Sequence, residues 1–139
     1  MKAQCMADTR RGASMVEFAI VLPVFLLLLL GIVEFGRAFM VYQVLTNAAR
    51  EGARTAILSY TTSDTQVRSR VANFLTAAKV PTDKRLKVTV TSDRGKLTDA
   101  IRGDSVQVNV SIAYSDVSLM APRFLSRATL TATSHMRRE

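Results

Sequence analysis

The sequence predicts an α+β fold in which one long N-terminal helix is followed by a short helix and a three-stranded antiparallel sheet. Three observations support this prediction. The segment Phe18–Val33 contains no charged residue, as is typical of a helix in an apolar environment. The helical spacing of apolar residues continues beyond this segment to about residue 58. Three later segments alternate between apolar and polar residues, which is the period of a half-buried strand.

The first helix is expected over 13–58, with a transmembrane part at about 14–36. The charge-free run is slightly shorter than the roughly 20 residues that span a bilayer, and extending it back to Ala13 across Glu17 makes up the difference. At 1.5 Å per residue the helix would be ~65 Å long, about twice the hydrocarbon thickness. Half of the helix should therefore project from the membrane. Pro23 is tolerated in such a helix and should kink it.

A removable signal peptide is the alternative interpretation of the apolar run. A signal peptide ends in a small-x-small cleavage site. The segment 36–38 reads Gly-Arg-Ala and follows Glu34, so it fits that site poorly. A membrane anchor is therefore favoured.

The projecting half of the helix is predicted to be amphipathic. One stripe is polar and another is apolar or small. The polar stripe consists of Gln43, Asn47, Arg50 and Arg54, and the other of Val41, Leu45, Ala48, Gly52 and Ala56. Small residues at helical spacing allow close backbone approach, and the candidates for such packing are Ala48, Ala49, Gly52, Ala53 and Ala56. Packing against the chain's own body is favoured over a contact between subunits.

Residues 59–139 are predicted to form a small α+β domain laid on the projecting half of the helix. Ser63 and Gln66 have the spacing of a helix-capping box, and the second helix should end before Pro81. Its buried face is expected to consist of Val67, Val71, Phe74, Leu75 and Ala78. Alternating patterns place the three strands at 86–91, 106–114 and 128–136, and an apolar connection lies between the last two.

Length, charge and residue usage exclude several classes of function. A chain of 139 residues is too short for separate cofactor and substrate lobes. Its net charge of +8 lies mainly in the body, but the basic residues are scattered and have no interleaved aromatic residues, so nucleic-acid binding is not expected. Cys5 and His135 are the only residues of their types, so neither a disulfide nor a zinc site is expected. Cys5 also precedes the apolar run, which argues against lipidation.

No catalytic motif or cofactor-binding motif is apparent, and the protein is not expected to be an enzyme. His135 is predicted to be exposed on the polar face of the last strand. Asp99 and Asp104 flank a loop that could hold a cation, but a solvated loop is favoured because calcium needs more oxygen ligands at close spacing.

The N-terminal edge of the apolar run contains one isolated carboxylate. Glu17 is costly within an apolar segment unless it lies near an interface or is paired. If the chain were cut after Gly12, the new ammonium group of Ala13 would lie one helical turn from Glu17. Glu17 could then pair with its own N-terminus or with that of a neighbouring subunit, and it would lie near the positive end of the helix dipole. A position in the headgroup region is the simpler alternative.

This arrangement of residues resembles a known family. A basic leader, Gly12, a glutamate five residues later and an apolar helix resemble type IV pilin-like proteins, which a prepilin peptidase processes. The segments 12–23 and 30–36, together with Asn47-Ala-Ala-Arg-Glu-Gly-Ala-Arg54 and the ending 132–139, are similar to TadE-like pseudopilins of the tight-adherence (Flp, type IVb-like) pilus system. The resemblance covers the first 55 residues most strongly. The chain lacks the body cysteines of some members, so no disulfide is implied.

The resemblance implies a pilin-like fold and the role of a minor pilin. Residues 1–12 would be a leader that is cut between Gly12 and Ala13, and Glu17 and Phe18 would act in processing and assembly. The expected partners are the prepilin peptidase, other pilins, the pilus assembly platform and inner-membrane lipid. The body would lie outside the cytoplasm, and the pilus would serve adherence, biofilm formation or secretion. Flanking charges do not decide the orientation, because basic residues lie at both ends of the apolar run. A permanently anchored envelope protein with a basic, partner-binding body is the alternative.

Overall fold

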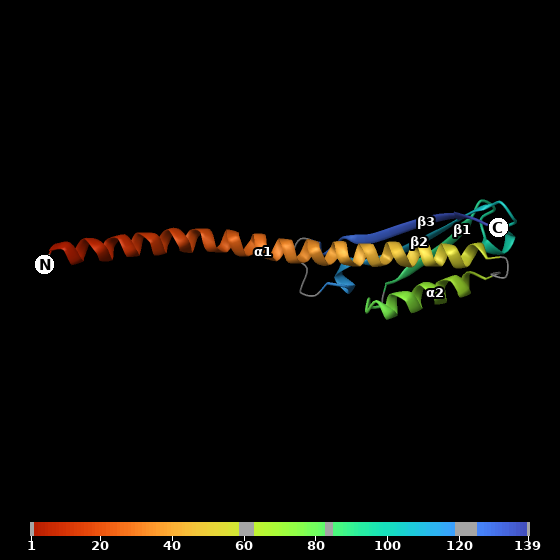
Figure 1. The fold of residues 1–139 in the computed structure, drawn as a ribbon, viewed down its shortest axis with the longest axis horizontal. Helices are drawn as coiled ribbons and strands as arrows, with labels where there is room; N and C mark the ends of the chain where they lie inside the picture. Colours follow the sequence, from red (N-terminus) through yellow and green to blue (C-terminus); the bar gives the residue numbers. More distant parts are fainter. Residues whose placement is uncertain (1, 59–62, 83–84, 119–124, 139) are drawn as a thin grey trace.

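The computed structural model describes residues 2–58, 63–82, 85–118 and 125–138, with side chains from Gly12 onward. Two helices are followed by three strands and two single-turn 3-10 helices, which confirms the predicted α+β arrangement (Figure 1). The elements are α1 (Lys2–Ile57), α2 (Asp64–Ala77), β1 (Lys87–Ser92), η1 (Leu97–Asp99), β2 (Ser105–Ala113), η2 (Tyr114–Asp116) and β3 (Thr129–Arg137).

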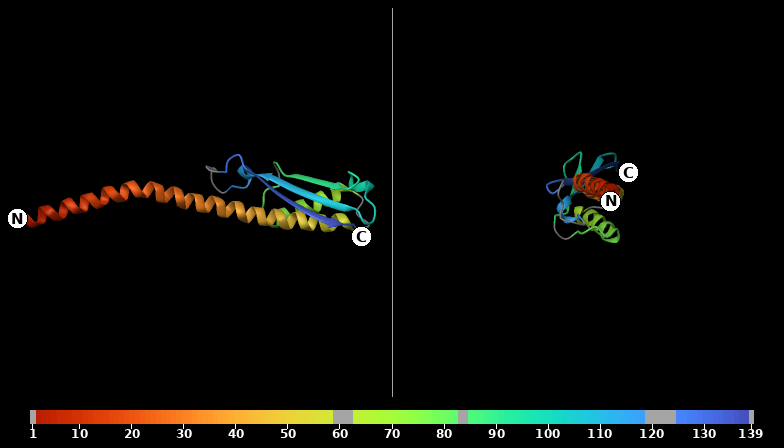
Figure 2. Two further views of the ribbon diagram at one scale, coloured as in Figure 1. Left: turned by 90° about the horizontal axis from the view of Figure 1, so that it is seen from above. Right: turned by 90° about the vertical axis from the view of Figure 1, so that its left-hand side faces the viewer.

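Helix α1 is longer than the sequence predicted, because it begins at Lys2 and includes the expected leader segment. Its 56 residues correspond to about 84 Å at 1.5 Å per residue. Residues 2–11 contain neither proline nor glycine, so no helix breaker separates the leader from the rest. The helix stays continuous through Pro23, and Figure 2 shows it bending within its N-terminal half.

The three strands form an antiparallel meander in the order β1-β2-β3. Val90 pairs with Val108 and Val110 pairs with Ala132, so the apolar residues of all three strands share one face of the sheet. The strands begin and end within about one residue of the predicted bounds, and Tyr114 belongs to η2 rather than to β2. The predicted connection between β2 and β3 is described except for residues 119–124.

Both helices lie on the same face of the sheet, and the core fills the space between them (Figure 2). The projecting half of α1 runs along β3 and β2, while α2 lies toward β1. The buried side chains of α1 repeat at helical spacing, as the sequence predicted. Among the described residues, the largest fully buried side chains are Val41, Leu45, Val67, Val71, Leu75, Leu97, Val106, Val108, Val110, Ile112 and Tyr114.

Gly52 marks a very close approach between α1 and the rest of the core. A Cβ atom on Gly52 would lie 2.6 Å from Cγ2 of Val71 and 3.2 Å from Cγ1 of Val108. The β-branched valine has little freedom to move away, so this position requires a residue without a side chain. The neighbouring small residues Ala48, Ala49, Ala53 and Ala56 are fully buried. This stripe of α1 therefore packs within the chain.

Helix α2 has the predicted Ser63 cap at its start and departs from the prediction on one face. The Ser63 hydroxyl caps the helix by accepting a hydrogen bond from the backbone N–H of Thr65 at 3.2 Å. The buried residues form a single stripe of Val67, Val71 and Leu75. Phe74 was predicted to be buried but is 36% exposed, because it lies beside this stripe, about 100° from Leu75 around a helix of 3.6 residues per turn.

We predict that Gly52→Ala lowers the free energy of unfolding by about 1 kcal/mol. Overpacking against Val71 costs roughly 1–3 kcal/mol, which exceeds the roughly 0.8–1.0 kcal/mol that alanine contributes through helix propensity. Gly36→Ala is the matched control, because a Cβ atom there meets nothing within 4 Å. Denaturant unfolding of the detergent-solubilised chain, followed by tyrosine circular dichroism, would compare the two variants. A stabilised Gly52→Ala variant would contradict the close packing.

Candidate functional site

The residues predicted for processing and assembly lie on α1, at the end remote from the body. Gly12, Ala13, Glu17 and Phe18 are all exposed and belong to one uninterrupted stretch of helix. Ala13 and Glu17 are four residues apart and so share one face of the helix. A side chain at Gly12 would meet nothing within 4 Å. The proposed cut is therefore accessible, on a segment that makes no packing contact at the glycine.

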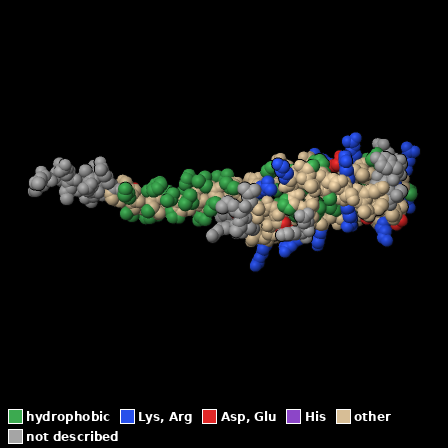
Figure 3. All heavy atoms as spheres, turned by 90° about the horizontal axis from the view of Figure 1, so that it is seen from below, with side chains coloured by type: hydrophobic (Ala, Val, Ile, Leu, Met, Phe, Trp, Pro, Cys, Tyr) green, Lys and Arg blue, Asp and Glu red, His purple; other side chains and the backbone are tan. Residues whose placement is uncertain are grey.

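The apolar half of α1 stands free of the body. Its most apolar 18-residue window has a mean hydropathy of 2.8, and none of it is buried. Figure 3 shows apolar side chains along this half, and the Lys and Arg side chains coloured there lie on the body. An exposed apolar surface of this size is not stable in water. By length and composition, this helix could span a membrane.

A set of hydrogen bonds, which we call the collar, joins α1 to the body where the apolar half ends. The Glu34 carboxylate accepts a hydrogen bond from the backbone N–H of Leu125 at 2.7 Å. The Tyr114 hydroxyl donates to the Glu34 carbonyl at 2.9 Å, and Arg37 Nε donates to the Val117 carbonyl at 3.1 Å. Both ends of the connection between β2 and β3 are thereby fastened to one turn of α1.

The collar combines a charge-assisted bond with a buried hydroxyl. Hydrogen bonds to an ionised carboxylate are stronger than bonds between neutral groups, so Glu34 is a firm attachment for Leu125. Tyr114 is only 1% exposed. Burial raises the pKa of the Tyr114 hydroxyl above its usual value, the nearby Glu34 carboxylate raises it further, and Arg37 partly opposes this. The protonated hydroxyl is therefore the form that the folded protein favours.

The collar was not predicted from the sequence, in which Glu34 and Arg37 are only charges near the end of the apolar run. Their partners lie 80 or 91 positions further along the chain, beyond the reach of any spacing rule. The only local signal was a glutamate followed by an arginine three residues later, which places both side chains on one side of the helix.

The predicted small-residue stripe lies far from the processing segment. Gly52 is 35 positions beyond Glu17, which corresponds to about 52 Å along the helix. Ala48, Ala49, Gly52, Ala53 and Ala56 face α2 and the sheet within the core. The structure thus separates the exposed segment around Glu17 from the stripe that holds the body.

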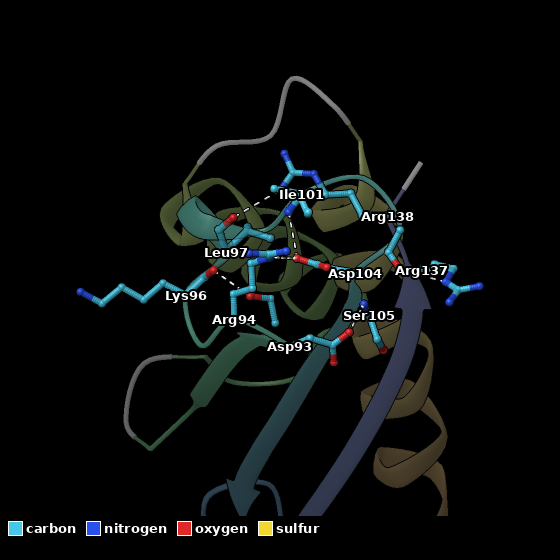
Figure 4. A network of polar contacts seen from close by, with 11 residues as sticks. Asp93, Arg94, Lys96, Leu97, Ile101, Asp104, Ser105, Arg137 and Arg138 are labelled. Carbon is cyan, nitrogen blue, oxygen red and sulfur yellow. Dashed lines mark hydrogen bonds and ion pairs between the residues drawn. The ribbon is translucent and has the colours of Figure 1, made fainter.

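The loop containing Asp99 and Asp104 connects β1 and β2, and Figure 4 shows the polar contacts around Asp104. Oδ2 of Asp104 accepts the backbone N–H of Ile101 at 2.9 Å and Arg94 Nε at 3.0 Å. The hydrogen bond from Ile101 is the main reason that the pKa of Asp104 is lowered. Asp99 accepts instead from the Thr98 hydroxyl at 3.1 Å. Among the described residues, no three His, Cys, Asp or Glu side chains form a group that could hold a metal ion.

The C-terminal end of β3 is tied to the same loop. The backbone N–H of Gly103 donates to the Arg138 carbonyl at 2.9 Å, and the backbone N–H of Arg138 donates to the Asp104 carbonyl at 2.8 Å. Arg137 Nε donates to the Gly103 carbonyl at 2.9 Å. His135 is exposed on β3 opposite Gln107, on the polar side of the strand as predicted.

We predict that Tyr114→Phe lowers stability by about 1 kcal/mol at neutral pH, as expected for one lost hydrogen bond. The pKa of Tyr114 is raised on folding, so its contribution is present below about pH 10 and is lost as the pH rises through the folded value. The difference between the two proteins should therefore shrink above about pH 10. Thermal unfolding of both proteins, from neutral pH to above about pH 10, measures this stability difference. The other tyrosines titrate in both proteins, so their effect cancels in the comparison. A difference that does not change with pH would contradict the role of the hydroxyl.

Comparison with known protein families finds a match that is confined to α1. The family model described as TadE-like protein matches residues 12–54. The match begins at Gly12, includes the collar residues Glu34 and Arg37, and ends before α2 and the sheet. No curated protein and no solved structure matches the chain. Residues 12–54 thus give the chain a TadE-like segment, consistent with a TadE-like pilin of the tight-adherence system.

Proposed function

We propose that the protein is a minor pilin of a tight-adherence pilus, which a prepilin peptidase cuts after Gly12. The observation that carries this proposal is that the TadE-like segment starts at Gly12 and contains the whole unburied apolar half of α1. Before assembly, this half spans the inner membrane and the body lies outside the cytoplasm. The protein then enters or initiates the pilus and contributes to surface adherence.

The low helix propensity of Gly12, the residue before the proposed cut, supports cleavage at this position. Glycine has the lowest helix propensity apart from proline, about 1 kcal/mol below alanine. Gly12 is exposed and has no packing neighbour that would offset this cost. Local unwinding of α1, which a peptidase needs in order to reach a peptide bond, is therefore easiest around Gly12.

Glu17 becomes a first-turn residue of the helix once the leader is removed. The new ammonium group of Ala13 then lies one turn away on the same face, and the carboxylate lies near the positive end of the helix dipole. A carboxylate among apolar side chains requires a partner. In the membrane that partner is the chain's own N-terminus, and in the pilus it is the N-terminus of an adjacent pilin.

The body is carried rigidly by the same helix. The collar at Glu34 and the close packing at Gly52 leave no linker between the apolar half and the sheet. The apolar half and the body would therefore move as one rigid unit when they contact other pilins and the assembly platform. The small-residue stripe is buried in the body, so contacts with other pilins involve the apolar half.

Cleavage is tested by the intact mass and N-terminal sequence of the protein from its native membrane fraction. We expect a chain that begins at Ala13. Gly12→Leu should leave the leader attached, whereas Gly31→Leu, at another open position of α1, should be cut normally. An uncut wild-type chain would favour the permanently anchored envelope protein, and a chain that begins near Phe39 would mean a secreted domain.

The assembly role is tested at Glu17. Glu17→Ala and the similarly sized Glu17→Gln should both insert into the membrane but lose nearly all pilus incorporation. Each substitution leaves the N-terminal ammonium group of the adjacent pilin unpaired in an apolar setting, which costs roughly 3–5 kcal/mol. Membrane fractionation and electron microscopy of surface pili measure the two outcomes. Glu51→Ala is the control, since that carboxylate pairs with Arg70 on the body. Normal piliation in both Glu17 variants would refute the assembly role.

A further inference from the structure

The sheet has a second face, which is turned away from both helices. Its side chains alternate with the buried residues of each strand; they are exposed on β1 and β3 and half-exposed on the central strand β2. We call this the outer face. It consists of Lys87, Thr89, Thr91, Ser105, Gln107, Asn109, Ser111, Ala113, Thr129, Thr131, Thr133, His135 and Arg137.

Hydroxyl and amide groups form a regular grid on the outer face. Strand pairing places Thr89, Asn109 and Thr133 in one row, and neighbouring strands are about 4.8 Å apart. Asn109 Nδ2 donates to Oγ1 of Thr133 at 3.0 Å, which holds both side chains in place. Such short side chains offer both donors and acceptors to a ligand.

The charge on the outer face is entirely positive. None of the strand residues is acidic. Lys87 pairs with Ser111, and Arg137 pairs with Ser105 at the diagonally opposite corner. These rows are six residues apart on β2, which corresponds to about 20 Å. Arg137 Nε is held by the Gly103 carbonyl at 2.9 Å, and Figure 4 shows its side chain extending from the end of β3.

Two carboxylates of the loop between β1 and β2, at the Ser105 end of the sheet, are already engaged. Asp93 accepts the backbone N–H of Ser105 at 2.7 Å, and Asp104 accepts from Ile101 and Arg94. The helical layer also carries exposed cations, Arg54 and Arg68 among them, together with an ion pair between Arg70 and Glu51 at 2.8 Å. The two cations of the outer face therefore favour an anionic partner.

We propose that the outer face binds an anionic polysaccharide. The hydroxyl and amide grid would hydrogen-bond to the sugar hydroxyls, and Lys87 and Arg137 would meet acidic groups along an extended chain. Ala113 is the only apolar side chain of the outer face, so the face lacks the apolar centre of a protein interface. It also has no Phe, Tyr or Trp side chain, whereas single-stranded nucleic acid requires stacking platforms. This inference goes beyond the pilus assignment and does not depend on cleavage at Gly12.

The test measures binding of alginate oligomers to the full chain in phosphatidylcholine nanodiscs. Dextran serves as the uncharged polysaccharide, and inorganic polyphosphate serves as an anion without sugar hydroxyls. We expect alginate to bind more tightly than either, with an affinity that falls as salt is added. Equal or tighter binding of polyphosphate or dextran would overturn the proposal, and so would a lack of alginate binding at low salt.

Two pairs of variants locate the binding. Lys87→Glu combined with Arg137→Glu should weaken alginate binding by about tenfold or more, because two attractive contacts become repulsive. Arg54→Glu combined with Arg68→Glu makes the same change in charge on the exposed helical side and should retain binding within about twofold. An equal loss in both double variants would overturn the assignment to the outer face.

The second pair changes the centre of the grid. Thr133→Glu should weaken alginate binding by about tenfold. Thr133→Gln introduces a side chain of the same size as glutamate but without charge, and it should retain binding within about threefold. Thermal unfolding establishes that each variant is folded. Unchanged binding in Thr133→Glu would overturn the proposal. The comparison of alginate, dextran and polyphosphate on the unmodified chain tests the proposal even if a variant does not fold.

Discussion

The close packing of α1 against α2 and β2 is the constraint on which the rest of the structure depends. Without a side chain at Gly52, Val71 and Val108 can both approach the helix backbone, and the neighbouring alanines keep the stripe flat. About half of α1 is thereby an internal element of the body, while the other half remains bare. A body of this size has little other apolar surface to bury, since small domains are only marginally stable. The projecting half of α1 is therefore an essential part of the core as well as a continuation of the anchor.

The collar sets where the helix changes from one environment to the other. Glu34 and Arg37 bind backbone groups of the segments that flank the connection between β2 and β3. Tyr114 adds a buried hydroxyl to the same turn of the helix. These bonds satisfy polar groups where an apolar helix meets a folded body, and buried polar groups are costly when they lack partners. The body thus begins at a defined residue of α1.

Much of the fold could be predicted from the sequence because its signals are local. The stripe from Val41 to Ala56, the Ser63 cap and the three alternating segments depend on spacing within one element. Phe74 was misassigned because a helix packed on one sheet can bury a narrower face than its apolar residues suggest. The alternation predicted a polar side for each strand, but the rows across the outer face depend on strand register and could not be predicted. The collar could not be predicted either, since it depends on contacts between distant residues such as Glu34 and Leu125. Gly12 and Glu17 are exposed, and their roles in processing and assembly stay predictions.

The continuity of α1 from the apolar half into the core has a mechanical consequence. A tension applied to the body passes directly into a helix that is packed lengthwise along β2 and β3. Pulling along the helix axis shears many side-chain contacts and the collar bonds together, whereas pulling on a flexible tether would first straighten the tether. The chain therefore has almost no slack between an anchored end and the sheet. The chain should therefore be stiff along the helix axis, so that a small displacement of one end produces an equal displacement of the other.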